Sequence, residues 1–570
     1  MFIISIKQYI KTPSIRVITI LYFIYLGYVL GTTPCVDLSY PFMVYMGQIK
    51  ITFLFFLFVS YEFFSKSKRE KIEEVLYTCK KGGGLAKLSG ISIFVLLDAL
   101  ICIILLAFLY IVAYVQEVNE WKYFVYLLQC TLIHHFLIYL LAVLLGFLVS
   151  FVNSRTVGYG ILMGTIFLMG HTFIVALNNV SFGIEALYRI TDLLSLITRE
   201  FYAAPNLYYM FSIEPVNIQR VLFWVLLTIS ILCVVMNCGR KRYLAVIPGI
   251  SVLICAVLFF QPTSAAYVDV ASGQDSWTAD DAYYTYTANT DSSNEVVEAE
   301  FKVSKYKMVF DVQRELKAEV EVWIDGNDLH DYDFTLYHGY KIKCVKDGNG
   351  HKLPFEQKGD YATIVGDNIQ RLIFEYEGCC KRYYSTVQGV FLPAYLEYYP
   401  VPGKRPVYKN EYYYTGNTLE GLGYEVYFDI MINTKEKVYS NLEEIDKNHV
   451  SGTADGVTLF CSPFAAEMQI GQCRIIYPVL GYYGEKLKEQ EELFTQFINK
   501  YQGDDSVAGK MILIPPEING SFYYFGSDHL IGDIYMLSSN YDRYVTTGEL
   551  YPYISEEELM EELEQIEQGG

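Results

Sequence analysis

The stretch SKSKREKIEEVLYTCKKGGGLAKLSG, residues 65–90, separates two long apolar runs. It is rich in Lys and Arg, and Ile72, Val75 and Leu76 follow the i, i+3, i+4 spacing of one face of a helix. The glycines Gly82 to Gly84 are poor helix residues and good C-terminal caps. We therefore expect a short amphipathic helix that lies on a membrane surface, with its charges in water, and ends at these glycines.

The flanking sequence predicts a membrane protein with about seven spans. A helix needs roughly 20 apolar residues to cross the hydrocarbon core of a bilayer. Runs of suitable composition lie near 14–31, 46–64, 91–115, 123–150, 157–178, 219–237 and 243–261.

Basic residues predict the orientation of these spans. They gather in alternate loops, at Lys7, Lys11 and Arg16, in the 65–90 stretch, at Arg155 and at GRKR, 239–242. The positive-inside bias makes these loops cytoplasmic. An odd number of spans then places residues 262–570 outside the cell, with the N-terminus inside.

Charge differs sharply between the two halves of the 570-residue chain. Residues 1–261 hold 19 Lys and Arg against 12 Asp and Glu, whereas the whole chain has a net charge of −19. The outer half is therefore acidic, which argues against nucleic acid as a partner. Five of the 12 cysteines lie in this half; Cys461 and Cys473 could close a disulfide loop, or all could be free thiols.

Four ionisable residues lie within the apolar runs and are candidate pore-lining groups: Asp98, His134, His135 and His171. Such groups are costly at membrane depth and usually face a bundle interior or a water-filled cavity. The alternative is that they satisfy a neighbouring helix.

No cofactor site is predicted from motifs. Gly82 precedes Lys87 by five residues, but a phosphate-binding loop needs a second Gly directly before Lys-Ser/Thr. None of the eight histidines forms the His-Glu-x-x-His motif of a zinc peptidase. We therefore expect neither a nucleotide, nor a metal, nor enzymatic activity.

The order of spans, with KREKIEEVLYTCKKGGGLAKLSG after the second, resembles ABC-2 type transporter permeases over residues 1–240. In that family the cytoplasmic element after the second span is a coupling helix that docks on a separate ATP-binding subunit. The resemblance transfers this contact by position to the residues Lys68, Arg69, Glu70, Glu73, Glu74, Leu76 and Tyr77. It also implies a second permease half and a bacterial plasma membrane.

After a linker at 262–294, the outer half predicts short strands. ELKAEVEVWI, 315–324, alternates so that Leu316, Ala318, Val320, Val322 and Ile324 share one face. A succession of such strands over 295–480 predicts a β-sandwich with one wet face per sheet.

Residues 296–480 are similar to the N-terminal domain of M1-family aminopeptidases. The similarity rests on LPAYLEYYP, 392–400, and on GYEVYFDIMINTKEKVYSNLE, 423–443. Residues 481–570 resemble the start of a peptidase domain and end in a predicted helix at SEEELMEELEQIEQ, which opens with a capping box at Ser555 and Glu558. The zinc ligands of that family are absent, so this small α/β part is expected to be non-catalytic.

The leading hypothesis is the membrane subunit of an ABC-2 type transporter, with a bundle of about seven spans and an outer mainly-β domain. The alternative is a membrane-anchored binding or sensory protein whose outer domain captures a ligand. An active metallopeptidase is a third reading, which the missing motif disfavours.

Overall fold

The chain forms two compact units. The helical unit comprises Met1–Pro205, Phe211–Gln261 and Asp269–Ser272, and the β unit comprises Asn206–Met210, Pro262–Val268 and Gly273–Gly570. The computed structural model describes residues 2–35, 39–70, 82–116, 118, 121–170, 185–196, 208–236, 246–266, 283–284, 297–326, 329–381, 383–410, 415–417, 421–470, 473–479, 492, 511–513, 529–531 and 534–536.

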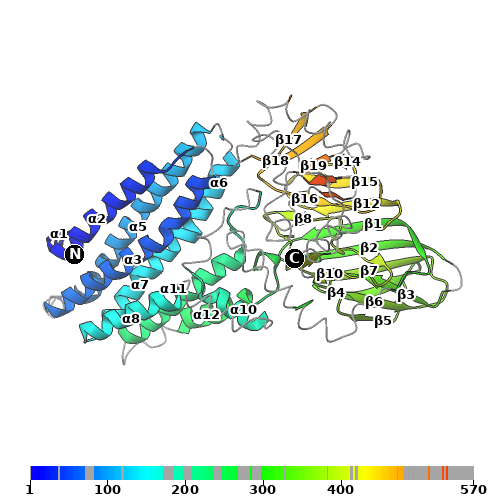
Figure 1. The fold of residues 1–570 in the computed structure, drawn as a ribbon. Coiled ribbons are helices and arrows are strands. Elements are labelled where there is room, and N and C mark those ends of the chain that lie inside the picture. Colours follow the sequence, from blue (N-terminus) through cyan, green and yellow to red (C-terminus); the bar gives the residue numbers. More distant parts are fainter. Residues whose placement is uncertain are drawn as a thin grey trace, which may run out of the picture. The chain divides into compact units, whose positions relative to one another are not determined.

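The described part of the helical unit consists of helices and short connections (Figure 1). In chain order these are α1 (Phe2–Lys11), α2 (Pro13–Thr32), α3 (Ser39–Arg69), α5 (Gly82–Val115), α6 (Trp121–Cys130), η1 (Thr131–Phe136), α7 (Leu137–Val149), α8 (Arg155–Leu168), α10 (Glu185–Leu194), α11 (Pro215–Met236) and α12 (Val246–Phe259). Pro13 starts α2, where its missing N–H and fixed φ favour a first helical turn.

Five helices are long and apolar enough to cross a membrane: Pro13–Thr32, Tyr40–Arg69, Leu85–Val115, Trp121–Val149 and Pro215–Met236. They coincide with five of the predicted runs. The other two runs overlap the shorter apolar helices Arg155–Leu168 and Val246–Phe259, of 14 residues each. Among the described residues, five helices are therefore long enough to span a membrane, and the predicted number of seven spans is not confirmed.

The charged stretch after the second run differs from its prediction. Tyr61–Arg69 is the end of α3, which is continuous from Ser39, and not the first half of a separate surface helix. Gly82–Gly84 form the first turn of α5. The rest of the predicted surface helix, residues 71–81, lies outside the described residues. Extending an existing helix costs less than nucleating a new one, and cations in the last turn favour the helix dipole.

The interior of the helical unit is built on a close approach of α3 and α7. A Cβ atom at Gly146 would lie 2.0 Å from Ser60 Oγ and 2.6 Å from the Leu57 carbonyl oxygen. Small residues allow this kind of backbone contact between membrane helices. Outward-facing side chains remain apolar, as at Ile24 and Ile103, which are 63% and 62% exposed. Such a surface suits a hydrocarbon environment.

The β unit contains several sheets. The largest has seven strands in the order β14 (Glu443–Asp446), β15 (His449–Ala454), β12 (Val426–Asn433), β1 (Lys302–Val312), β2 (Leu316–Asp325), β7 (Arg371–Gly378), β4 (Tyr340–Asp347). Its pairs are antiparallel except β1 with β12, in which Lys305 is opposite Tyr427. This parallel pair was not predicted.

Smaller sheets complete the unit. Four strands form the order β5 (Phe355–Lys358), β6 (Tyr361–Val365), β3 (Asp331–Thr335), β9 (Val401–Pro402), and three form β13 (Val438–Ser440), β16 (Leu459–Cys461), β8 (Val390–Leu392). Five form β17 (Ala465–Ile470), β18 (Cys473–Pro478), β19 (Met511–Leu513), β21 (Ile534–Met536), β20 (His529–Ile531), and two form β10 (Tyr408–Asn410), β11 (Thr415–Asn417). The helix predicted near residues 555–566 lies outside the described residues.

Alternation in β2 is confirmed. Its apolar residues Leu316, Val320 and Val322 have no exposed surface, while Lys317 and Glu319 face water.

The opposite, wetter face of the seven-stranded sheet carries alternating cations and rings. Lys305 Nζ lies 5.1 Å from the Trp323 ring centre and 5.2 Å from that of Tyr427. Such cross-strand pairs stabilise neighbouring strands.

Tyrosine hydroxyls satisfy backbone groups inside the β unit. Tyr306 donates to the Pro400 carbonyl oxygen at 2.8 Å, Tyr376 to that of Tyr398 at 2.5 Å, and Tyr398 to that of Val457 at 2.8 Å. Each ring adds apolar area while its hydroxyl finds a partner. The abundance of tyrosine in the outer half is therefore structural.

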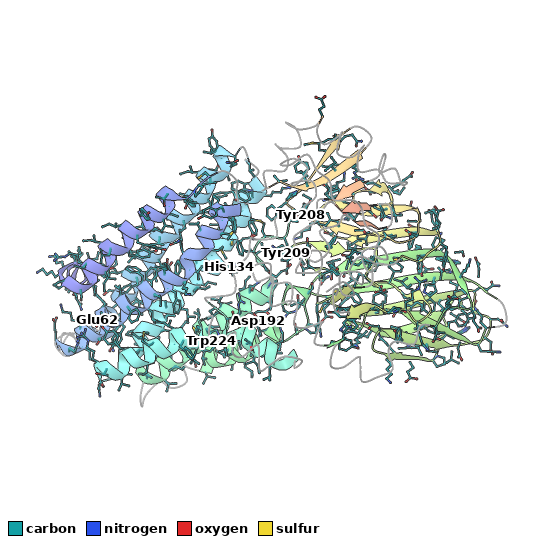
Figure 2. All side chains as sticks on the ribbon, viewed as in Figure 1. Glu62, His134, Asp192, Tyr208, Tyr209 and Trp224 are labelled. Carbon is teal, nitrogen blue, oxygen red and sulfur yellow. The ribbon has the colours of Figure 1, made fainter. Side chains whose placement is uncertain are left out.

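A short piece of the N-terminal half is part of the β unit. Tyr208 donates to the Ile476 carbonyl oxygen at 3.1 Å, and its own carbonyl oxygen accepts from Ser462 at 2.6 Å. Tyr209 bonds the Thr386 hydroxyl at 3.1 Å. Figure 2 shows both tyrosines. The domain boundary predicted near residue 261 therefore omits a segment that belongs to the β unit.

An ion-pair network joins β17 and β18 to β14. Glu467 is 2.7 Å from Arg474 and 3.0 Å from Lys437, and both cations also reach Glu444, at 3.5 and 3.1 Å. Partial burial pushes the pKa of Glu467 upward. Hydrogen bonds and charges of Arg474 and Lys437 outweigh this, so its pKa lies below the ordinary value.

We predict that Gly146→Ala destabilises the helical unit by about 1–3 kcal/mol, because the new methyl group overlaps Ser60 and the Leu57 carbonyl of α3. Thermal unfolding of the full-length protein in detergent measures this. Gly27→Ala in α2 is the matched control, since its Cβ would meet nothing within 4 Å. Equal melting temperatures for the two variants would contradict the close approach.

We predict that Glu467→Gln lowers the free energy of unfolding at pH 7 by about 1 kcal/mol or less. Because the folded pKa is depressed, this stability is complete above the ordinary glutamate pKa and is lost as the pH falls through the folded value. Thermal unfolding of the full chain over a pH series checks it. Exposed Glu443→Gln is the control, and a pH-independent Glu467→Gln effect would contradict the prediction.

Candidate functional site

The charged end of α3 is held by the loop before α8 and by α8 itself. Glu62 is only 8% exposed. Its Oε1 lies 2.9 Å from Arg155 Nη2 and also accepts from the Tyr159 hydroxyl, while its Oε2 lies 3.4 Å from Arg69 Nη2. Lys68 donates to the Phe151 carbonyl oxygen at 3.0 Å. We call Glu62, Arg69, Arg155 and Tyr159 the Glu62 cluster.

Local sequence explains this geometry. Glu62 and Arg69 are seven residues apart, two turns on one side of α3. Ser154 caps α8 by accepting from the Val157 N–H at 3.4 Å, which places Arg155 at the start of the helix. Gly158 leaves room for Tyr61, because a Cβ there would lie 2.2 Å from the Tyr61 hydroxyl. The cluster therefore fixes α8 to α3.

Other basic elements gather at the same end of the helical unit. Ser5 of α1 bonds Ser89 of α5 at 2.7 Å, and Lys66 of α3 reaches Thr12 at 3.4 Å. Lys87 of α5 lies 4.9 Å from the Phe151 ring centre. Three of the basic segments therefore lie together, and the membrane side on which they lie stays a prediction.

Among the predicted coupling residues, Lys68 and Arg69 are in the last turn of α3, and Glu70 follows it, 3.5 Å from Lys66. Glu73, Glu74, Leu76 and Tyr77 lie outside the described residues, as does the candidate pore residue His171. The predicted docking contact itself therefore stays a prediction.

The three described candidate pore residues are all buried. Asp98, on α5, accepts from the Cys102 thiol at 3.3 Å. His134 and His135 lie on η1, a π-helix between α6 and α7. His134 Nε2 is 2.9 Å from the Ser212 carbonyl oxygen, and His135 Nδ1 is 2.7 Å from the Tyr139 hydroxyl. These bonds go to Cys102 on the same helix, to Tyr139 one turn further along the chain, and to the segment before α11, and a pore-lining role stays a prediction.

A second buried carboxylate was missed by sequence reasoning. Asp192 of α10 pairs with Arg189 at 3.1 Å and with Arg220 of α11 at 3.0 Å, and all three side chains are at most 6% exposed. Arg189 also lies 4.5 Å from the Phe259 ring centre, on α12. Trp224 donates to the Leu193 carbonyl oxygen at 2.7 Å. This group joins three helices, and Figure 2 shows Asp192 and Trp224 within it. The i, i+3 pair in LYRITDLL was the only local signal.

The described part of the β unit contains pairs of histidine and aspartate side chains. His338 and Asp360 are 3.2 Å apart and buried; His449 and Asp429 are 2.7 Å apart. Among the described residues no three His, Cys, Asp or Glu side chains could hold a metal ion together. His529 is in β20, and its side chain is outside the described set.

Cys461 is a free, buried thiol, so it does not form the disulfide considered with Cys473. Burial raises the pKa of Cys461 to about 12, despite its bond with Thr434. A thiol of this kind is unreactive, because the thiolate is the nucleophile.

No protein-family model and no curated protein matches this chain. Similar solved structures are M1 peptidases. Native leukotriene A4 hydrolase from Saccharomyces cerevisiae aligns at 12% identity over 45% of this chain and 43% of its own, with a TM-score of 0.30. The M1 zinc metallopeptidase from Deinococcus radiodurans aligns at 11% identity over 43% of this chain and 62% of its own, with a TM-score of 0.29.

The chain thus spans less than two thirds of either relative. TM-scores of this size do not establish a common fold, and the activities of those proteins are not transferred to this chain. No comparison tests the permease resemblance, which stays a prediction.

We predict that Glu62→Gln destabilises the helical unit by about 2 kcal/mol, because Arg155 and Arg69 lose a shared, mostly buried carboxylate. Thermal unfolding in detergent measures the change. Glu70→Gln is the matched control: that carboxylate is 51% exposed with one partner, Lys66, and its loss should cost about 0.5 kcal/mol at most. Equal effects would show that the Glu62 cluster contributes no special stability.

Proposed function

We propose that this chain is the membrane subunit of an ABC-2 type transporter, driven by a separate ATP-binding subunit and paired with a second permease half. The observation that supports this most is the Glu62 cluster. It ties the end of α3, which leads into the predicted coupling segment, to the start of another apolar helix, α8.

The cluster supplies a route for mechanical coupling. ATP-driven closure of the partner would push on residues 65–78. Because α3 is one continuous helix, a displacement at Arg69 moves the whole span. Glu62 and Lys68 would pass the same displacement to α8 and to the loop at Phe151. The close contact at Gly146 would carry it to α7.

The proposed topology follows the charge bias. The five long helices and the two shorter ones would together make seven crossings of a bacterial plasma membrane, with the N-terminus in the cytoplasm. The β unit would then be extracytoplasmic, with an M1-like sandwich arrangement and no catalysis. The substrate would pass between this subunit and the second half.

We predict that Glu73→Lys with Glu74→Lys abolishes co-purification of an ATP-binding subunit from native membranes, because it reverses charge on the proposed docking surface. Mass spectrometry of the purified material measures this. The matched control is Glu117→Lys with Glu120→Lys, the same charge change in a loop assigned to the outer side.

Unchanged association of the first variant would contradict the docking surface. A membrane-impermeant maleimide provides a topological check on Ser67→Cys, with Cys35 replaced by Ser because its thiol is exposed. Labelling of Ser67→Cys in intact cells would place the surface on the wrong side. If no ATPase co-purifies with the wild type, the binding or sensory protein becomes the better reading.

A further inference from the structure

Asp98 differs from Glu62 and Asp192, two other buried carboxyl groups of the helical unit. Glu62 and Asp192 each contact two arginines. Asp98 has no exposed surface, and among the described residues it has no cationic partner. Its Oδ1 accepts from Cys102 at 3.3 Å, and its Oδ2 has no hydrogen-bond partner there. It sits on α5, which is almost wholly apolar from Ile91 to Val115.

Hydroxyl groups lie on helices near Asp98, but none of them bonds its carboxyl group among the described residues. Tyr22 of α2 and Tyr139 of α7 are near enough to interact with its charge. Thr52 of α3 bonds the Tyr22 hydroxyl at 2.8 Å and also contacts the Tyr139 hydroxyl. All of these side chains are at most 5% exposed.

One base, His135, is hydrogen-bonded to one of these hydroxyl groups. His135 of η1 shares a 2.7 Å hydrogen bond with Tyr139 through Nδ1, and its Nε2 has no partner among the described residues. The titratable groups near Asp98 are therefore Cys102 on its own helix, Tyr22, Tyr139 and, through Tyr139, His135. Tyr45 of α3 adds a ring 4.1 Å from that of His135, and its hydroxyl bonds Thr131.

These contacts determine which form of Asp98 the site tolerates. A carboxylate without cation or N–H donors is far more costly in an apolar interior than a neutral acid. With the proton on Oδ2, Oδ1 remains the carbonyl oxygen that accepts from Cys102. At Asp98 the structure therefore accommodates a proton. At Glu62 and at Asp192, two arginines compensate the charge instead.

We propose that Asp98 is a proton-binding site of the helical unit and that it exchanges its proton with His135 through the Tyr139 hydroxyl, once α5 and α7, which pack on each other, shift enough for that hydroxyl to reach Oδ2. In this step the Asp98 Oδ2–H bond breaks and its proton goes to the Tyr139 oxygen. The Tyr139 proton forms a new bond to His135 Nδ1. An acid and a neutral imidazole become a carboxylate and an imidazolium, with no net change of charge and no redox partner.

A change in helix packing would trigger the step, since Asp98, Tyr139 and His135 lie on α5, α7 and η1. The π-helix geometry of η1 is one that often marks functional sites in membrane and soluble helices. This inference does not depend on the ATPase partner, and it assigns to the helical unit a ligand, the proton, in addition to any transported substrate.

Infrared spectroscopy of the full-length protein in lipid bilayers tests the bound proton. At pH 7 exposed carboxyl groups are ionised, since their ordinary pKa is about 4. We expect a neutral-acid C=O band in the wild type that is lost in Asp98→Asn. Identical spectra would overturn the proposal. If Asp98→Asn does not fold, ¹³C-labelled aspartate in the wild type identifies the band by its isotope shift. The absence of a shifted acid band would then overturn the proposal.

Transfer into D₂O tests exchange. The acid band of the wild type should move to lower frequency as deuterium replaces the proton. Tyr139→Phe should keep the band but slow this shift, whereas the control Tyr45→Phe, equally buried but bonded to Thr131, should exchange like the wild type. A wild-type band that never shifts would show a purely structural acid. Unchanged exchange in Tyr139→Phe would overturn the route.

Discussion

Charge in a low-dielectric interior must be compensated, and the helical unit meets this constraint in two ways. Arginine pairs compensate Glu62 near one end of the helices and Asp192 among α10, α11 and α12. These pairs join helices that are far apart in sequence, so removing one partner would leave a buried charge and loosen a helix junction. Asp98 has no such pair and is accommodated by protonation instead.

The need to compensate buried charge also explains why α3 contacts several other segments of the helical unit. Its apolar part packs on α7 at Gly146, and its charged end holds the start of α8 and the loop before it. A rigid helix that contacts other segments both along its apolar part and at its charged end can transmit a displacement at one end to several of those segments. This property fits a permease subunit, and it would equally suit a receptor that signals through its spans. The identity of the companion protein separates these readings.

Sequence periodicity predicted the elements better than their junctions. Alternation in ELKAEVEVWI identified the buried face of β2, because a strand has only two faces. The apolar strip at Ile72, Val75 and Leu76 indicates a helix but not where it starts, so the sequence does not show that residues 65–69 continue α3. Composition also located α8 and α12, each of which has 14 residues in the described part of the chain.

The contacts of the candidate site were harder to predict. Glu62 and Arg155 lie on different helices and share no motif, so only the folded arrangement shows that they meet. The π-helix at His134 and His135 leaves no periodic signal in such an apolar segment. Tyr208 and Tyr209 belong to the β unit although they precede two further apolar helices, which no composition boundary indicates. The parallel partner of β1 is likewise remote in sequence.

That parallel pair has a consequence for biogenesis. β1 occupies the middle of the seven-stranded sheet, yet one of its two neighbours, β12, is synthesised only after β2 to β11. Pairings this distant along the chain close slowly. During synthesis the hairpin of β1 and β2 would therefore wait with one unpaired edge, and such edges attract other strands. A chain of this kind should need protection from aggregation until β12 emerges, so a folding helper that binds the β unit would raise its yield.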